Sequence, residues 1–131
     1  MADYTVVNLK RDVEDMAPKF ELAPGLESRF ARVPLGLANS GASYFRIAPG
    51  FRVPFGHRHS EQEEVYVVAS GGARLKLDDD IIELGQWDMV RIAPGVWRGI
   101  EGGPEGTELI AFGAPNTENK DAEMQPGWWS D

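Results

Sequence analysis

Two histidines and a glutamate lie close together in one short stretch of this chain. His57 and His59 are the only histidines among 131 residues, and Glu64 follows five positions after the second. Residues two apart on a strand project to the same side, about 7 Å from each other, so two imidazoles at this spacing can converge on one cation. A turn at 60–62 would let Glu64 begin a neighbouring strand and point back at them. Such a set suits a divalent transition metal such as iron, zinc, manganese or nickel.

The alternative interpretation is a pair of surface or hydrogen-bonding histidines beside an acidic loop. In that case Glu61 and Glu63 are ordinary solvated charges of the same loop. A histidine pair of this spacing is weak evidence for a metal by itself, so the surrounding elements must decide.

Short β-prone runs separated by turn residues make up most of the chain. We predict strands at 27–33, 42–48, 64–69, 73–77, 81–84, 87–93, 96–101 and 107–112. Ser70-Gly71-Gly72 predicts a tight hairpin, and 78–80 predicts a second turn. Near the N-terminus, at most one helical turn is expected, capped by Asp12, running through Met16 and ended by Pro18. Many short strands at this spacing favour an all-β antiparallel sandwich or barrel.

Composition narrows the functions further. The net charge is −8 and the pI about 4.7, without a Lys/Arg cluster, so nucleic acid and anionic membranes are poor partners. The absence of cysteine excludes disulfides and thiolate chemistry. No secretory signal or membrane-spanning run is evident, so we expect a cytoplasmic protein. We expect one domain over 1–131, with a polar tail at 116–131.

The segment 50–71 resembles the first motif of the cupin superfamily, commonly written G-x5-H-x-H-x3–4-E-x6-G. Gly50 lies one position too far upstream, but the two histidines, Glu64 and Gly71 follow the pattern. Glu63 would satisfy the shorter spacing, whereas Glu64 sets the distance to Gly71.

The segment 85–98 resembles the second cupin motif, G-x5-P-x-G-x2-H-x3-N, more loosely. One extra residue precedes Pro94, and none separates it from Gly95, so the usual histidine position falls on Arg98. The resemblance implies a double-stranded β-helix, a jelly-roll barrel, with both motifs inside and dimers formed through strand edges. It also implies that the two histidines and Glu64 are metal ligands, but the third histidine of metal-binding cupins is missing.

Arg98 brings a fixed positive charge to the place of that third histidine, because a guanidinium keeps its proton in proteins. At about 4 Å and an effective dielectric near 20, it would repel a dication by roughly 8 kcal/mol. If Arg98 pairs with Glu64, the pocket is metal-free and could bind a small anion. If Arg98 leans toward the barrel mouth, it anchors an anionic substrate beside a three-ligand metal with open positions. An exposed arginine without a role is the third reading.

Several further side chains are candidates for the barrel interior. Tyr66 has the same strand parity as Glu64, so we expect it to line the site. Arg46 is a second anion anchor if it points inward, and a solvated charge otherwise. The terminal pair Trp128–Trp129 should fold back over the barrel or dock on another subunit, because free tryptophans would expose much apolar area.

These observations support two main functions. The first is a small-molecule cupin with a divalent metal at His57, His59 and Glu64, acting as an enzyme on a small anionic substrate by dioxygenation, decarboxylation or isomerisation. The second is a metal-free ligand-binding or sensor cupin, in which Arg98 pairs with Glu64 or binds an anion. A barrel with a decayed site that acts only through its surface is a third.

Overall fold

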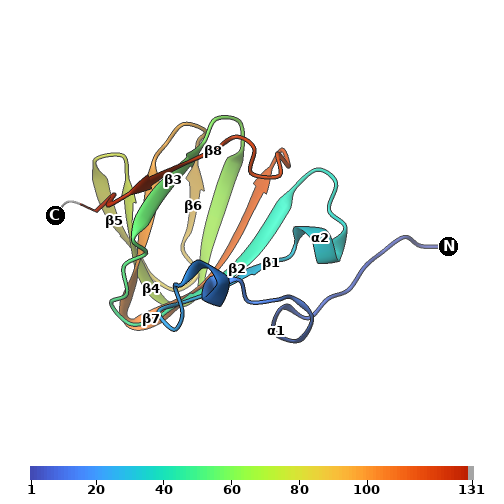
Figure 1. Cartoon of the computed structure of the whole chain (residues 1–131), viewed down its shortest axis with the longest axis horizontal. Coiled ribbons are helices and arrows are strands. Elements are labelled where there is room, and N and C mark those ends of the chain that lie inside the picture. Colours follow the sequence, from blue (N-terminus) through green and yellow to red (C-terminus); the bar gives the residue numbers. More distant parts are fainter. Residues whose placement is uncertain (130–131) are drawn as a thin grey trace.

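The computed structural model describes residues 1–129, whose strands form one curled antiparallel sheet with short helices on its N-terminal side (Figure 1). The strands are β1 (Leu26–Phe30), β2 (Gly41–Ile47), β3 (Phe55–His59), β4 (Glu63–Leu77), β5 (Asp80–Leu84), β6 (Met89–Ile92), β7 (Arg98–Ala114) and β8 (Ala122–Pro126). The helices are α1 (Leu9–Asp12), the 3₁₀ helix η1 (Ala17–Phe20) and α2 (Arg32–Leu35). This architecture confirms the predicted all-β double-stranded β-helix.

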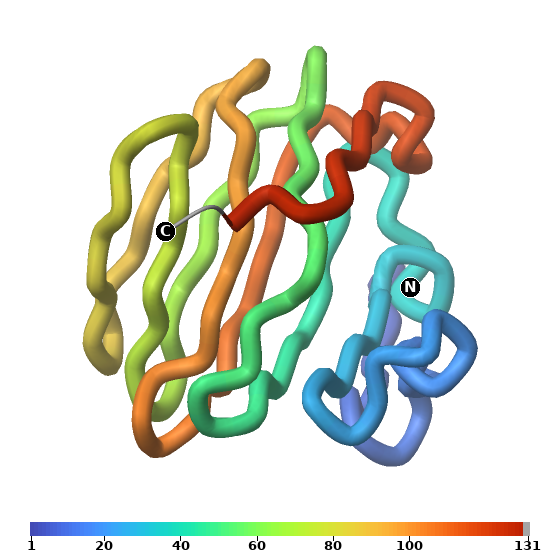
Figure 2. The backbone as a smooth tube through the Cα atoms, turned by 60° about the vertical axis from the view of Figure 1, so that its left-hand side comes forward, coloured from blue at the N-terminus to red at the C-terminus, as the bar shows by residue number. Residues whose placement is uncertain are grey.

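Strand β7 organises the sheet, because it pairs with β2, β3 and β4. One path of neighbours runs β1-β2-β7-β3-β8, and β4 adds β5 and β6 on its other edge. The β4–β7 pairing extends from Glu63 opposite Ala114 to Leu77 opposite Arg98. These two long strands therefore run through the whole barrel, as the tube in Figure 2 shows, and carry site residues at their ends.

The predicted hairpin at Ser70-Gly71-Gly72 is wrong, because β4 runs through it without turning back. The register between β4 and β7 shifts on either side of Gly71, whose φ is +73°. A Cβ at Gly71 would overlap the carbonyl oxygen of Gly106 on β7. The glycine thus allows a bulge and a close approach of two strands, which uses the same backbone freedom as a turn. The turn predicted at 78–80 is confirmed, since Leu77 pairs with Asp80.

The other predicted element bounds also need correction. The runs 96–101 and 107–112 belong to one strand, β7. Strand β3 was assumed only for the placing of His57 and His59, and β8 was not predicted. The run 27–33 is a strand only as far as Phe30, after which the chain turns into α2.

The N-terminal helical turn differs from the prediction in its cap and its end. The side chain of Asn8, not Asp12, caps α1 by accepting from the amides of Lys10 and Arg11. Pro18 lies at the start of η1, where its missing N–H costs nothing, so it begins a helix instead of ending one. Within residues 1–129, no helix has the length and apolar character needed to cross a membrane.

Two groups of buried apolar side chains hold the barrel together. The larger group fills the inner face of β4 and β7 and includes Val68, Leu75 and Leu109, each at most 1% exposed. The smaller group joins η1 to β1 and β2 through Ala17 and Ile47. Between them the interior is hollow, and this cavity contains the histidine motif.

Candidate functional site

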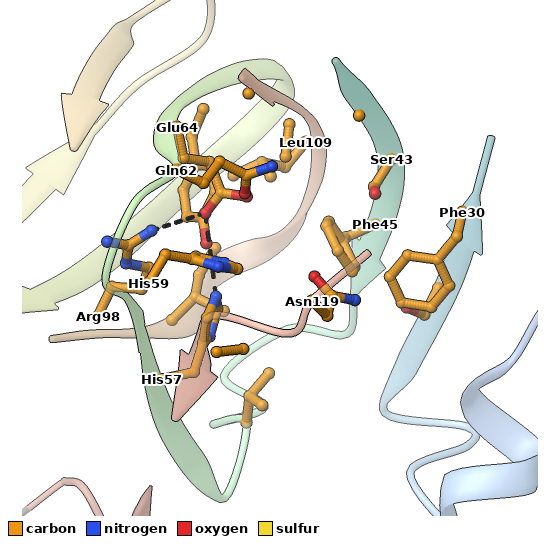
Figure 3. Close-up of a pocket in the computed structure, with 18 of the residues that line it drawn as sticks. Phe30, Ser43, Phe45, His57, His59, Gln62, Glu64, Arg98, Leu109 and Asn119 are labelled. Atoms are coloured by element: carbon orange, nitrogen blue, oxygen red, sulfur yellow. Dashed lines mark hydrogen bonds and ion pairs between the residues drawn. The ribbon is translucent and has the colours of Figure 1, made fainter. Parts of the chain in front are cut away.

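A cavity of about 820 Å³ opens inside the barrel, between β1–β2 on one side and β3 on the other. Its polar end is formed by His57, His59, Gln62, Glu64, Tyr66 and Arg98. Apolar side chains line much of the rest, among them Leu26, Phe30, Phe45, Ile47, Val53 and Phe55. Figure 3 shows Phe30 and Phe45 on the far side of the cavity from Arg98. The site is therefore a polar group at one end of an apolar chamber.

The three predicted ligand residues do meet. His57 and His59 come from β3, with ring centroids 5.2 Å apart and planes at 90°, and Glu64 comes from the start of β4. One ligand atom from each lies within 4.8 Å of the others. The bend at 60–62 reverses the chain as expected, so the residues form a candidate three-residue metal site.

Arg98 points inward and is 1% exposed. Its Nη1 donates to Glu64 Oε1 at 2.9 Å, as the dashed line in Figure 3 marks. Its Nε and Nη2 both donate to the carbonyl of Val96, and Nη2 also reaches the carbonyl of Ala93 at 3.4 Å. One bond from Nε, one from Nη1 and two from Nη2 use four of the five guanidinium N–H groups. Arg98 is thus an internal cation held by Glu64 and by backbone.

The donor types suit a metal ion, but Arg98 competes with it for Glu64. Ligands about 2 Å from one ion at tetrahedral angles lie about 3.3 Å apart, whereas His57 Nε2 is 3.9 Å from Glu64 Oε1. That same oxygen already accepts from Arg98, which would stay beside any ion bound there. In the arrangement described, the positive charge balancing Glu64 is the guanidinium, so the residues do not fit a tightly bound dication.

His57 is held neutral. Burial, the positive charge of Arg98 and the neighbouring His59 lower the pKa of His57 to about 3. At physiological pH its ring therefore carries no charge, and each nitrogen can take part in a hydrogen bond according to the tautomer.

Asp121, which no sequence pattern indicated, lies directly behind His59. Its Oδ1 is 3.0 Å from His59 Nδ1, and both side chains are about 5% exposed or less. The carboxylate also accepts from the Thr117 hydroxyl at 2.6 Å and from the amides of Glu61 and Gln62 at 3.0 Å. Burial would raise the pKa of Asp121, but these hydrogen bonds outweigh it and hold the pKa well below its usual range. Asp121 is 62 residues from His59 in a polar segment, and no spacing signal pointed to it.

Tyr66 is buried at the site as its strand parity predicted. Burial, the negative charge of Glu64 and a hydrogen bond to that carboxylate raise the pKa of Tyr66 well above its usual value, while Arg98 opposes the shift. The phenol therefore keeps its proton and is a hydrogen-bond donor.

Arg46 does not line the cavity, so of its two expected positions the structure has the outward one. Its strand neighbours Phe45 and Ile47 line the cavity, so the alternation of β2 turns Arg46 to the outer face. There its Nε lies 3.0 Å from Glu27 Oε1, and its side chain is 43% exposed.

The terminal tryptophans fold back onto the outside of the barrel, which confirms that expectation. The ring of Trp128 lies 5.6 Å from that of Trp97, and the Arg52 guanidinium lies 4.4 Å from the Trp129 ring centroid. The chain between Asn116 and Met124 contributes to the cavity wall.

Comparison with known proteins agrees with this fold. The cupin domain family matches residues 43–110, just over half of the chain. No curated protein matches the sequence.

Solved structures share the fold at low sequence identity. A cupin protein from Bacteroides fragilis is 24% identical with a TM-score of 0.71, covering 89% of this chain and 88% of its own. Oxalate decarboxylase from Bacillus subtilis is 22% identical with a TM-score of 0.72, covering 92% of this chain, which spans 33% of that protein. A variant of Streptomyces PAC13 with uridine is 15% identical with a TM-score of 0.72, covering 97% of this chain and 93% of its own.

Proposed function

This chain belongs to the cupin family, and we propose that it binds an uncharged small molecule, using the Arg98–Glu64 ion pair in place of a metal ion. The observation that carries the proposal is the buried guanidinium of Arg98, 2.9 Å from Glu64 Oε1 at the position of the third histidine of metal-binding cupins. A side chain that already neutralises Glu64 removes the need for another cation.

The remaining polar groups favour a ligand that donates hydrogen bonds. Arg98 has one N–H left, which is too few for the two-pronged grip on a carboxylate or phosphate. An anion would also meet the negative charge of Glu64. The neutral ring of His57 and the second oxygen of Glu64 can accept hydrogen bonds from hydroxyl or amide groups. We therefore propose an uncharged ligand, and not the anion expected from the sequence.

The rest of the cavity favours a ligand that also has an apolar or aromatic part. Its volume of about 820 Å³ lies within the range of small-molecule sites. Phe30 and Phe45 pack edge to face, with centroids 6.0 Å apart, and both line the wall opposite the polar end. The similar fold of PAC13 is described with uridine, an uncharged molecule that combines hydroxyl groups with a planar ring. That description supports the ligand class and not a particular ligand.

Within such a site, the polar residues would form the hydrogen bonds and the apolar residues would exclude water. Tyr66 keeps its proton and donates to Glu64, so Tyr66 and Arg98 together hold the carboxylate in place, and Glu64 keeps acceptor capacity for the ligand. The apolar walls exclude water from these bonds, which strengthens them.

A second candidate is metal-dependent chemistry at His57, His59 and Glu64. The observation in its favour is that one ligand atom from each lies within 4.8 Å of the others. A divalent metal would supply Lewis-acid activation of a substrate there. This candidate requires Arg98 to release Glu64 and move away.

Metal binding separates the two candidates. Protein purified without a metal-affinity tag should contain no stoichiometric transition metal, and Zn²⁺ titrated by calorimetry should bind weakly. Arg98→His removes the buried charge and adds a fourth ligand. Even at twice the distance assumed above, Arg98 would repel a dication by about 4 kcal/mol, so Zn²⁺ affinity should rise by at least about a thousandfold. In parallel, uridine serves as the first uncharged probe of the cavity.

Arg46→His is the matched control, since Arg46 lies on the outer face and pairs with Glu27. It should leave Zn²⁺ affinity unchanged. Tight stoichiometric metal in the natural protein, unaffected by Arg98→His, would contradict the proposal and support the metal-dependent candidate.

A further inference from the structure

The C-terminal segment, residues 116–129, wraps the strand that carries both histidines. Strand β8 pairs with β3 in antiparallel register, from Phe55 opposite Pro126 to His59 opposite Ala122. Figure 1 shows β8 beside β3, and in Figure 2 the red C-terminal run continues across the sheet beyond it. The segment also supplies Asn119 and Met124 to the cavity wall. The histidine strand is thus held between β7 and this segment.

We propose that Asp121 is a positioning residue that fixes the tautomer and orientation of His59, and that Trp128 anchors the segment carrying it. The proposal does not depend on which function the site performs, because ligand binding and metal binding would both use the free nitrogen of His59. It assigns a role in the site to a segment outside the matched family region 43–110.

The hydrogen bonds around Asp121 allow the neutral His59 ring only one tautomer and one orientation. An ionised carboxylate only accepts, so His59 Nδ1, 3.0 Å from Oδ1, must carry the proton of that bond. When the ring is neutral, Nε2 then has a lone pair and belongs to the site. The carboxylate itself cannot rotate freely, because Oδ1 also accepts from Thr117 while Oδ2 accepts from two backbone amides.

The anchor lies where the chain has glycines next to site residues. A Cβ at Gly56 would be 2.5 Å from the Trp128 ring, and one at Gly99 would be 2.6 Å from it. Gly56 precedes His57 and Gly99 follows Arg98, so the indole packs on the backbone behind both site strands. The Lys76 ammonium donates to the Trp128 carbonyl at 3.0 Å. These contacts fix the far end of the segment that carries Asp121.

Asp121→Asn gives a sharp test because it keeps the size and changes the donors. Two backbone amides point at Oδ2 and cannot accept, so they require the amide oxygen of the new side chain. The amide nitrogen must then face His59, and a donor there forces Nδ1 to accept. We expect the ring proton to move from Nδ1 to Nε2, reversing the tautomer of His59.

The measurement is long-range ¹H–¹⁵N NMR of the full chain in mildly alkaline solution, where imidazoles are neutral. His57 is the sole other histidine, so the spectrum of His57→Gln shows which signals belong to His59. In proteins that keep His57, its signals serve as an internal reference. Natural protein should show His59 protonated on Nδ1, and Asp121→Asn should show it on Nε2, with circular dichroism confirming that both are folded. A His59 that carries its proton on Nε2 in the natural protein, or keeps it on Nδ1 in folded Asp121→Asn, would overturn the positioning role.

Two further variants test the segment. Glu123→Gln is the matched control on the same strand, because Glu123 pairs outward with Arg58, and it should leave the His59 spectrum unchanged. Trp128→Ala should give a mixture of His59 tautomers, since the segment loses its anchor. A single unchanged tautomer in Trp128→Ala would overturn the anchoring role, and a tautomer change in Glu123→Gln would show that any change in β8 acts on His59.

Discussion

Two largely buried carboxylates, Glu64 inside the barrel and Glu27 on its outer face, form similar ion pairs with different roles. Inside, Glu64 pairs with the single cation Arg98 beside a cavity and two histidines. Outside, Glu27 on β1 receives Lys10 at 3.0 Å, Arg29 at 2.6 Å and Arg46 at 3.0 Å.

The outer cluster consists of Glu27 with Lys10, Arg29 and Arg46. Its carboxylate is fully paired, and the cluster connects distant parts of the chain. Three cations surround one carboxylate, and Lys10 brings the N-terminal segment against β1 and the Tyr44 ring. The inner cluster consists of Glu64 and Arg98 with His57 and His59. Its hydrogen-bond acceptors face the cavity of about 820 Å³. The difference shows that an ion pair on a strand does not indicate a functional site by itself. A functional site is indicated by polar groups beside a cavity that still have unused hydrogen-bonding capacity.

Removal of the inner cation should have the largest effect. Arg98→Met leaves Glu64, whose side chain is 14% exposed, without its partner, and should destabilise the protein by about 3–5 kcal/mol. Urea unfolding followed by circular dichroism measures the change. Arg46→Met is the outer counterpart and should cost less than about 1 kcal/mol, because Glu27 keeps two cations and Arg46 is half-exposed. Equal losses from the two variants would remove the distinction between the clusters.

The pH dependence of the inner cluster should be intermediate in size. The pKa of His57 is about 3 in the folded protein against 6.5 in the unfolded chain, so the unfolded state binds the extra proton between these values. Stability should therefore be lost as pH falls below 6.5, by about 2 kcal/mol down to about pH 5. His57→Gln should remove this part of the slope in urea titrations at a series of pH values. An identical slope in both proteins would show that His57 titrates normally.

The contribution of the outer cluster to stability should change only in stronger acid, and this change should be the smallest of the three effects. Burial raises the pKa of Glu27, but hydrogen bonds from Arg29, Lys10 and Arg46 outweigh it and bring the pKa to about 2, against 4.5. Its stabilisation is then complete above pH 4.5 and lost as pH falls toward 2. Glu27→Gln should cost about 1–2 kcal/mol at neutral pH, since Lys10 is half-exposed, and the cost should vanish in acid. A loss of stability in Glu27→Gln that does not depend on pH would show that the variant acts through packing and not through charge.

Local patterns in the sequence were sufficient to predict the barrel and the meeting of the three candidate ligand residues. Alternation placed His57 and His59 on one face and Tyr66 on the face of Glu64, because side chains on a strand follow a fixed period. Glu64 itself was placed by the turn expected at 60–62. The inward position of Arg98 came from the resemblance to the second cupin motif. Alternation left the position of Arg46 open, since it gives the two faces of β2 but not which one is interior.

The remaining features depend on contacts between distant parts of the chain. Asp121 reaches His59 only after β8 pairs with β3, and the short polar run around it carries no strand signal. Gly71 was read as a turn because a bulge and a hairpin need the same positive φ, and only the partner strand distinguishes them. Single-sequence reasoning lacks that partner.

The long β4–β7 ribbon has a consequence for how fast the molecule can assemble. Its closest pairing, Leu77 with Arg98, already joins residues 21 apart, and its other end joins Glu63 to Ala114, 51 apart. Chain closure over such separations slows the search for the native topology, so we expect folding in milliseconds to seconds. The pocket would then come into being in the same kinetic step as the barrel, and stopped-flow fluorescence of the tryptophans can time it.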